Sequence, residues 1–563
     1  MSKGSNRIPE NLFTRRAILV GAAGVALGTA SVALGASITS GRITQTRPRQ
    51  ENVIEPSVGA TEIYPGDPRY SAFQSGINNR FVGRPDVVKI VRGADDAARG
   101  LQEAVDKGTV VGIRSGGHCA SDFIAHDGIR TLFDLSPLNI VDFDADRDAY
   151  VVGAGARLFE VYDSLYRNHR VTLPGGVCHS VGIGGHVAGG GYGFLSRQFG
   201  LVVDHLRAVE VTHVDNNGNV NTTIATNDPN DPAYDLWWAH TGGGGGNFGI
   251  VTRYWFHTPN AERGLIEPPS KVLVRAIDFP WNDLDESRFK RLLANFSTWH
   301  ELNSDPGSPH SHLSTLFNIN SIAHGHLSMF IQIDASVASA RAIVDDFVRI
   351  VCAGVSEPRP MSVASGELGA MPRLFETTEI PWWQAVRMTG APDVIGLNPD
   401  ARIGIKSAYF RSHFTDTHLS AIYRYLSDEN YGNPDASIVL LSYGGAINAK
   451  TESESSSAQR DSVIKALFLN IWSDANDDAT HLQWIRGFYA DTFADTDGVP
   501  AIDGVTDGAY INYPDSDLAD VRYNKSMHQW HELYYKRNYP RLQQVKRVWD
   551  PKNIFRHSLS IRS

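Results

Sequence analysis

Short apolar runs and amphipathic stretches alternate along the first half of the chain. Residues 86–91 (DVVKIV) and 110–114 (VVGIR) are predicted strands because they are rich in β-branched residues, and 95–107 has helical spacing with an acidic start. The alternation continues with strands expected at 132–135 and 149–153 and a helix at 158–168. A pattern of this kind predicts an α+β domain.

Longer apolar runs follow in the second half, after a segment rich in proline and glutamate. Runs such as 327–333 and 437–441 predict extended strands, which we expect to form an antiparallel sheet covered by helices on one face. Near the end of the chain, 525–548 has the periodicity of one amphipathic helix, ended by Asp550-Pro551. A chain of 563 residues is too long for one core, so we expect two lobes.

The first 40 residues differ from the rest. Arg15-Arg16 precedes an uncharged stretch that runs to Gly41 and is rich in Gly, Ala, Ser and Thr. Weak hydrophobicity behind an arginine pair predicts a twin-arginine export signal over 1–40, with an N-terminal membrane anchor as the alternative. We therefore expect a periplasmic or extracellular protein, with no stable membrane association after cleavage, and a polar tail over 41–65.

Charge and cysteine content narrow the function classes. There are 52 Lys and Arg against 62 Asp and Glu, a net charge of −10, which argues against nucleic-acid binding. The three cysteines, Cys119, Cys178 and Cys352, are odd in number and widely spaced, so they indicate no disulfide framework. At least one of them has another role, and a bridge between Cys119 and Cys352 remains open.

Glycine is concentrated in three bursts. The first is Arg114-Ser115-Gly116-Gly117-His118, directly after a predicted strand, where consecutive N–H groups can face an anion. The second has nine glycines between 175 and 193, interleaved with Val, Ile, His and Tyr, and the third, 242–249, leads into a strand. So many glycines disfavour a stable helix or strand, and the composition is not that of a disordered segment, so we expect these loops to wrap a ligand.

The order of the bursts, together with 510–515 (YINYPD) and 538–542 (NYPRL), resembles the berberine bridge enzyme-like family of FAD-linked oxidases, in the vanillyl-alcohol oxidase fold group. The resemblance runs from about residue 70 to the C-terminus. It implies an α+β, two-lobed FAD-binding fold. The FAD-binding domain would span 66–265, the substrate domain 266–495, and a C-terminal segment, 496–563, would return to the FAD domain.

The resemblance also implies how FAD is held. His118 would bond the flavin 8α-methyl group and Cys178 the ring carbon C6, which would account for one cysteine of the odd count. The first burst would approach the phosphates, the second the ribityl chain and ring, and the segment 249–251 the adenosine, while Asn538 would lie near the ring. The implied FAD-binding residues are His118, Cys178, Arg114, Ser115, Gly116, Gly117, Val181, Gly182, Gly185, His186, Gly190, Gly249, Val251, Tyr513 and Asn538.

Two tyrosines are the candidate catalytic residues. Tyr513 resembles the family's catalytic tyrosine, which takes the hydroxyl proton, and Tyr443 resembles the second tyrosine of the members that oxidise sugars. A carboxylate base is the alternative, with Glu452 and Glu454 as candidates, although their polar surroundings favour a solvated loop. Val181 resembles the small residue that lets O₂ reach the flavin.

We therefore predict an FAD-dependent oxidase that acts on a secondary hydroxyl of a sugar or a glycosylated natural product and reduces O₂ to hydrogen peroxide. One alternative is an oxidative cyclisation that forms a C–C or C–N bond on an alkaloid- or polyketide-type metabolite. An alternative of another class is a flavin-carrying surface protein of low turnover. The expected partners are a small-molecule substrate and O₂, and no oligomeric state is predicted.

Other residues depart from the family pattern or compete for the site. Thr241 and Lys536 stand where many relatives have Arg and Gly, and Lys406 and Arg411 lie on a predicted strand that would face the site. Four histidines are paired at strand spacing, but without a matching Asp, Glu or Cys we predict no metal site. These histidines are His310, His312, His324 and His326.

Overall fold

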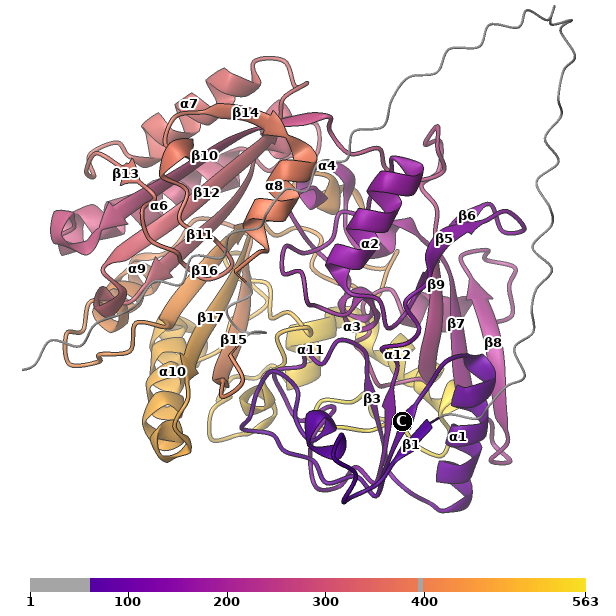
Figure 1. Ribbon diagram of the computed structural model, residues 1–563. Helices are drawn as coiled ribbons and strands as arrows, with labels where there is room; N and C mark the ends of the chain where they lie inside the picture. Colours follow the sequence, from indigo (N-terminus) through magenta and orange to yellow (C-terminus); the bar gives the residue numbers. More distant parts are fainter. Residues whose placement is uncertain (1–60, 393–397) are drawn as a thin grey trace, which may run out of the picture. The chain divides into compact units, whose positions relative to one another are not determined.

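Three β-sheets organise the part of the chain that the computed structural model describes, residues 61–392 and 398–563 (Figure 1). The expected export signal and nearly all of the expected polar tail lie outside the described residues. The sheets are built from consecutive stretches of sequence, 61–134, 141–256 and 271–472. Each sheet therefore arises from one continuous part of the chain.

The first sheet has four strands in the order β1-β2-β4-β3. Strands β2, β4 and β3 run parallel, and the crossover from β2 to β3 is the helix α1, which buries Ala97, Leu101 and Ala104. The elements expected here are confirmed to within one or two residues, and β3 ends directly before the first glycine burst. Their bounds are β1 (Thr61–Ile63), β2 (Val87–Ile90), α1 (Ala94–Asp106), β3 (Val111–Arg114) and β4 (Thr131–Asp134).

The second sheet is antiparallel, in the order β5-β6-β9-β7-β8. The strand expected at 149–153 is confirmed as β6, and the helix expected at 158–168 is α2 followed by a π-helical turn, Leu165–His169. Strand β9 begins directly after the third glycine burst. The bounds are β5 (Val141–Asp144), β6 (Ala149–Gly153), α2 (Leu158–Ser164), β7 (Leu206–Val214), β8 (Val220–Thr226) and β9 (Ile250–Phe256).

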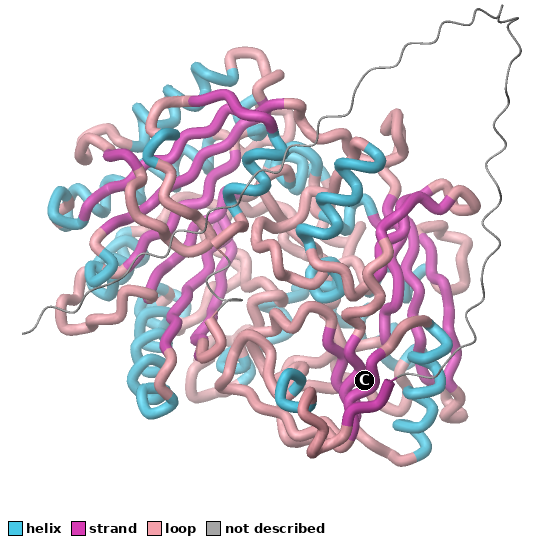
Figure 2. Tube along the Cα trace, viewed as in Figure 1, coloured by secondary structure: helices cyan, strands magenta, loops and turns pink. Residues whose placement is uncertain are grey.

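The third sheet has eight antiparallel strands in the order β13-β10-β12-β11-β16-β17-β15, with β14 also paired to β10. Helix α7 contacts α6, α6 contacts α9, and α9 contacts α10, so these four helices form one layer against the sheet (Figure 2). The expected antiparallel sheet with helices on one face is confirmed. The long elements are β10 (Lys271–Pro280), α6 (Glu286–Leu302), β11 (Ser314–Asn320), β12 (His326–Asp334), α7 (Ala340–Val351), β15 (Arg402–Phe410), α9 (Asp416–Leu426), β16 (Ala436–Ser442), β17 (Ile464–Trp472) and α10 (Asp478–Thr492), and the short ones are β13 (Arg359–Pro360), β14 (Thr378–Pro381) and α8 (Trp382–Thr389).

The C-terminal segment, drawn in yellow in Figure 1, connects the third sheet to the glycine bursts. The Tyr409 amide of β15 donates to the Gly508 carbonyl at 2.9 Å, and Lys546 Nζ donates to the Asn247 carbonyl at 2.8 Å. Both contacts are buried, so they hold the C-terminal segment against the third sheet and the third glycine burst. Among the described residues, no helix has both the length and the apolar character required to cross a bilayer.

The single helix expected over 525–548 is wrong. The structure has two helices, α11 (Trp530–Tyr535) and α12 (Tyr539–Trp549), separated by a 3₁₀ turn at Lys536–Asn538. Lys536 has a φ of +48°, a left-handed conformation that interrupts a helix and favours glycine. The positive φ therefore explains why many relatives have glycine at this position. The helix end before Asp550-Pro551 is confirmed.

Candidate active site

A cavity of about 380 Å³ lies between the glycine bursts and the helix-free face of the third sheet. All three bursts line it, as do strands β11, β15, β16 and β17 and two parts of the C-terminal segment, 510–514 and 555–557. The cavity therefore has one wall made mainly of loop backbone, which we call the glycine wall. The opposite wall is made of side chains on the sheet and the returning segment.

The first two glycine bursts touch each other through their backbones. A Cβ atom on Gly116 would lie 2.4 Å from the Gly182 nitrogen, and one on Gly182 would lie 2.2 Å from the Gly116 nitrogen. No side chain fits at either position. Gly185 differs, because a Cβ there would meet no protein atom within 4 Å. Its missing side chain leaves space on the cavity side.

His118 and Cys178 converge on the glycine wall. The Nε2 atom of His118 lies 2.6 Å from the Ser180 hydroxyl, and the Cys178 sulfur lies 3.7 Å from the same oxygen. Both residues line the cavity. Two nucleophilic side chains that are 60 positions apart in the sequence thus flank one hydroxyl, so a single planar ligand can be reached from both.

Part of the second burst is helical, contrary to the expectation that its glycines exclude a helix. Residues Ile183–Ala188 form the short helix α3 and bury Ile183, Val187 and Ala188, which offsets the low helix propensity of glycine. His186 of this helix accepts a hydrogen bond from the Gly176 amide at 3.2 Å, and burial lowers the pKa of His186 to about 3. The imidazole is therefore neutral at physiological pH.

Two tyrosines of the returning segment and one at the end of the second burst surround a buried lysine of the sheet, and we call this group the tyrosine wall. The Nζ atom of Lys465 lies 4.0 Å from the ring centre of Tyr192, 4.3 Å from that of Tyr510 and 5.4 Å from that of Tyr513. Burial raises the pKa of Tyr513 and lowers the pKa of Lys465 well below its usual range. All four residues line the cavity.

Sequence reasoning missed Lys465 and Tyr510. Lys465 is the only charged residue in the otherwise apolar strand β17 (IKALFLNIW), and this isolation was a usable signal. A charged side chain within an apolar run that is buried on both faces needs a specific reason. Glu367 was also missed, and it lines the cavity as well.

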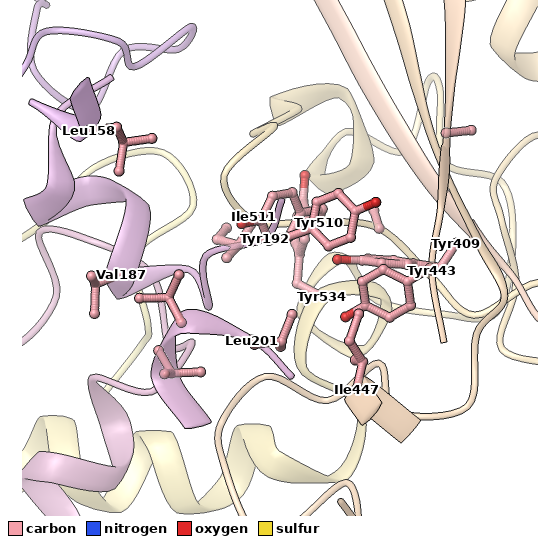
Figure 3. Close-up of a cluster of buried hydrophobic side chains, with 14 of the residues drawn as sticks. Leu158, Val187, Tyr192, Leu201, Tyr409, Tyr443, Ile447, Tyr510, Ile511 and Tyr534 are labelled. Carbon is pink, nitrogen blue, oxygen red and sulfur yellow. The ribbon is translucent and has the colours of Figure 1, made fainter. Parts of the chain in front are cut away.

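Tyr443, a candidate catalytic residue, does not line this cavity. It faces a smaller cavity behind the tyrosine wall, where Figure 3 shows it grouped with four other buried tyrosines, Tyr192, Tyr409, Tyr510 and Tyr534. Its hydroxyl donates to the Gln459 carbonyl at 3.2 Å. Its ring packs against those of Tyr192 and Tyr409, which holds the side chain behind the main cavity.

Three of the expected FAD-binding residues lie off the main cavity. The Arg114 guanidinium donates to the Ala72 carbonyl at 2.8 Å and supports the first burst from outside. Asn538 donates to the carbonyls of Glu452 and Ser455, at 2.8 and 3.1 Å. Gly190 lines the smaller cavity. The remaining expected residues do line the main cavity, namely His118, Cys178, Ser115, Gly116, Gly117, Val181, Gly182, Gly185, His186, Gly249, Val251 and Tyr513.

The other residues named from the sequence, Glu454, Lys406 and Arg411, each form hydrogen bonds or ion pairs with neighbouring residues. Glu454 accepts from Thr451 at 2.6 and 2.8 Å, as expected for a loop carboxylate. The expectation that Lys406 faces the site is wrong, because its Nζ lies 2.7 Å from Asp515 and 2.8 Å from Asp517 behind the tyrosine wall. Arg411 pairs with Asp461 at 2.9 Å.

The paired histidines do not share one face of a strand, since His324 lies in a 3₁₀ turn, Ile322–His324, and only His326 lies in a strand, β12. His310 and His312 lie in the 3₁₀ turn Pro309–His312, and within the described ranges no three His, Cys, Asp or Glu side chains are grouped closely enough to bind a metal. Cys119 and Cys352 are both free thiols, and burial raises the pKa of each to about 12.

The two departures from the family pattern both fit their surroundings. The Thr241 hydroxyl donates to the Trp238 carbonyl at 2.6 Å and accepts from the Ser456 amide at 2.9 Å, so a small hydroxyl side chain suits this buried position. The Lys536 ammonium lies 2.6 Å from the buried Asp507 carboxylate, which offsets the strain of its positive φ.

A glycine-rich cradle with a histidine and a cysteine on one wall, facing buried phenols and an amine on the other, defines a flavin-dependent oxidoreductase. Two family models match the chain. One is described as FAD binding domain and covers residues 85–223, and the other is described as Berberine and berberine like and covers residues 509–562.

Relatives extend this match over nearly the whole chain. The aclacinomycin-N/aclacinomycin-A oxidase of Streptomyces galilaeus is 40% identical over 566 residues, covering 98% of this chain and 99% of that protein. The hexose oxidase of Chondrus crispus is 31% identical over 527 residues, covering 88% and 93%. The chain therefore belongs to the berberine bridge enzyme-like family of FAD-binding oxidases, and it is an FAD-linked oxidoreductase.

Solved structures agree with this assignment. The glycopeptide hexose oxidase DBV29, complexed with teicoplanin, is 40% identical with a TM-score of 0.83, and the match covers 90% of this chain and 99% of that one. Aclacinomycin oxidoreductase is 41% identical with a TM-score of 0.82 and the same coverage. The expected two-lobed α+β fold of the vanillyl-alcohol oxidase type is confirmed.

Proposed function

We propose that this enzyme oxidises a secondary hydroxyl of a sugar or a glycosylated natural product and reduces O₂ to hydrogen peroxide. The observation that carries the proposal is the pairing of Tyr513 with the buried Lys465 across the cavity from His118 and Cys178. The names of the two relatives, an aclacinomycin oxidase and a hexose oxidase, support the substrate class.

We propose that FAD is held by two covalent bonds, one to His118 and one to Cys178. Both residues flank Ser180 on the glycine wall, so one ring system can reach both of them. When bound, the flavin supplies the hydride acceptor and transfers electrons to O₂. Val181, three positions after Cys178, lines the same wall, and its small side chain would leave a path for O₂.

Tyr513 and Lys465 would handle the hydroxyl proton. Burial favours the uncharged form of both, so the site holds a phenol beside an amine. Transfer of the phenol proton to Lys465 leaves a phenolate beside an ammonium ion, and the pair keeps a net charge of zero. The phenolate can then accept the proton of the substrate hydroxyl.

The rest of the cavity suits a glycoside. Leu316, Val439 and Leu441 provide apolar surface, while Asn318 and Glu367 supply polar groups that can orient sugar hydroxyls. Glu367 also favours a second candidate, an oxidative cyclisation with a carboxylate base, because its charge acts on Tyr513. A Glu367→Gln variant separates the two, since it should abolish a cyclisation and only weaken sugar binding.

We also propose export through the twin-arginine route, on the strength of Arg15-Arg16 and the weakly hydrophobic stretch that follows. Export of an already folded protein fits an enzyme that takes up its flavin before leaving the cytoplasm. Replacing both arginines with lysine should retain the protein in the cytoplasm. Secretion of that variant at the wild-type level would contradict the route.

The function is tested with purified protein and a panel of sugars, glycosides and alkaloid-type amines. We expect peroxide formation and anaerobic bleaching of the flavin with at least one sugar or glycoside. Bleaching only by amines, or by nothing in the panel, would overturn the substrate class. For the covalent bonds, acid-precipitated protein should remain yellow, and a colourless pellet with a yellow supernatant would overturn them.

A further inference from the structure

Asn512 connects the two walls of the cavity. Its side-chain Nδ2 donates to the His186 carbonyl, on the glycine wall, and to the Tyr510 hydroxyl, on the tyrosine wall, at 3.1 Å in each case. A carbonyl oxygen can only accept, so the atom that faces His186 must be the amide nitrogen. Asn512 stands in the motif 510–515 (YINYPD), and the proposed mechanism above gives its side chain no role.

The position of Asn512 is fixed by the glycine wall itself. A Cβ atom on Gly189 would lie 2.2 Å from the Asn512 Oδ1 atom and 2.6 Å from Nδ2, so the amide packs directly on the loop backbone. Gly189 lines the smaller cavity, and the helix that precedes it, with His186, lines the main one.

Among the three phenols around Lys465, Tyr510 is the one whose oxygen accepts a side-chain hydrogen bond. The Tyr192 hydroxyl donates to the Ser442 carbonyl instead, which retains its proton. Burial raises the pKa of Tyr510 only to about 12, because the bond from Asn512 opposes the effect of burial, whereas the pKa of Tyr192 and that of Tyr513 are raised further.

Tyr510 also lies between the main cavity and the smaller one, and it lines both. The smaller cavity has room for about one water molecule and is lined by hydroxyls, which is the setting in which buried water is found. Beyond it, the hydroxyl of Tyr409 is hydrogen-bonded to that of Tyr443. The Tyr510 hydroxyl therefore has polar neighbours on the side away from the substrate.

We propose that Asn512 is a positioning residue that makes Tyr510 the proton carrier of this site and ties that role to the glycine wall. The inference rests on the proposed function. Lys465 Nζ lies closer to the ring centre of Tyr510 than to that of Tyr513, at 4.3 against 5.4 Å, and the two rings meet edge to face. The proton that Tyr513 must lose before it can accept the substrate proton reaches Lys465 through Tyr510, which gives its own proton to Lys465 and takes the one from Tyr513. One O–H bond breaks and one forms at Tyr510, so it ends unchanged, and the proton stays on Lys465.

The first test measures anaerobic flavin reduction against pH in Asn512→Ala. Loss of a hydrogen bond to a forming phenolate should move the rising limb of the profile up by about one pH unit and slow reduction roughly tenfold at neutral pH, with KM little changed. Asn433→Ala is the matched control, because Asn433 Nδ2 also donates to two acceptors, Asn470 and the Ile471 carbonyl, but far from the cavity. Equal profiles for the two variants would overturn the inference.

A double variant shows whether Asn512 acts through Tyr510. In a Tyr510→Phe background the Asn512→Ala change should cause no further shift, because the hydroxyl that receives its hydrogen bond is gone. A shift of the same size in both backgrounds would mean that Asn512 acts elsewhere. Acid-precipitated protein should stay equally yellow in all variants, which separates this effect from loss of flavin.

The second test needs no substrate. An ultraviolet difference titration of the flavin-loaded protein should show one buried tyrosine that ionises before the other buried ones. That step should disappear in Tyr510→Phe and move to higher pH in Asn512→Ala. If no sugar or glycoside reduces the wild-type enzyme, the proposed function fails, and the titration still decides whether Asn512 controls Tyr510. An unchanged titration would overturn the inference.

Discussion

The two walls of the cavity are built by different means. The glycine wall consists of backbone from three local bursts, and its contacts exclude side chains, as at Gly116 and Gly182. The tyrosine wall consists of side chains from distant segments, such as Tyr192, Lys465 and Tyr513, which meet only in the folded chain. Cofactor binding is therefore encoded by local sequence motifs, whereas the side chains that move protons are brought together by tertiary packing.

The largest expected effect is at Tyr513, on the tyrosine wall. Tyr513→Phe removes the group that takes the hydroxyl proton and should slow anaerobic flavin reduction by roughly 10²–10⁴-fold. Stopped-flow absorbance of the flavin measures this rate. Tyr489→Phe is the control, because it also removes a phenol hydroxyl, and that hydroxyl donates to the Ser407 carbonyl away from the cavity. A Tyr513→Phe rate equal to that of the control would remove Tyr513 from the mechanism.

A smaller effect is expected at Lys465. Lys465→Met keeps the apolar stem but removes the cation that stabilises the phenolate, so reduction should slow roughly 10²-fold at neutral pH. The pH at which the rate reaches half its maximum should rise. Lys465→Arg keeps a cation and should recover part of the rate. If the pH–rate profile of Lys465→Met coincides with that of the wild type, the reaction does not need the positive charge of Lys465.

Low pH should lower the free energy of unfolding of the lobe that carries the glycine wall. Burial lowers the pKa of His205 and that of His240 to about 4, while the unfolded chain takes up these protons near pH 6.5. Stability is therefore lost as pH falls through that window, by about 2 kcal/mol per histidine from pH 7 to 5. Thermal unfolding at the two pH values measures this loss.

The His240→Asn variant sharpens the acid prediction. The imidazole Nδ1 of His240 lies 2.8 Å from the Leu236 carbonyl, and an asparagine amide can supply the same donor. The variant should lose less stability between pH 7 and 5 than the wild type does, and the difference should equal the contribution of one histidine. An identical loss in both proteins would show that His240 is protonated in the folded state.

The smallest effect is expected at Gly185, on the glycine wall. A Cβ there meets no protein atom within 4 Å, so Gly185→Ala should fold normally but reduce the space for the flavin. The non-covalent binding of FAD that precedes the two bonds should weaken roughly tenfold, the lower part of the range for overpacking. Gly432→Ala, whose Cβ is also free of contacts, is the control. Equal flavin content in the two variants would place the flavin away from Gly185.

The local sequence pattern predicted most helices and strands correctly where contacts between sequence neighbours determine the secondary structure. Strands β2, β3 and β6 and helix α1 follow directly from β-branched runs and helical spacing. The helix expected over 525–548 failed because its periodicity continues through Lys536, which adopts a positive φ and pairs with Asp507, a residue outside the local pattern.

The sequence by itself determined the family, the cofactor, and His118 and Cys178 as the candidate flavin attachments, because these depend on short motifs with fixed spacing. The tertiary structure alone decided which polar side chains face the cavity. It placed Lys465 among three phenols, moved Tyr443 behind them, and brought Asn512 against both walls. The physical reason is that a buried charge or hydroxyl takes its role from the side chains packed around it, and the sequence pattern near each residue does not show which segments of the folded chain supply them.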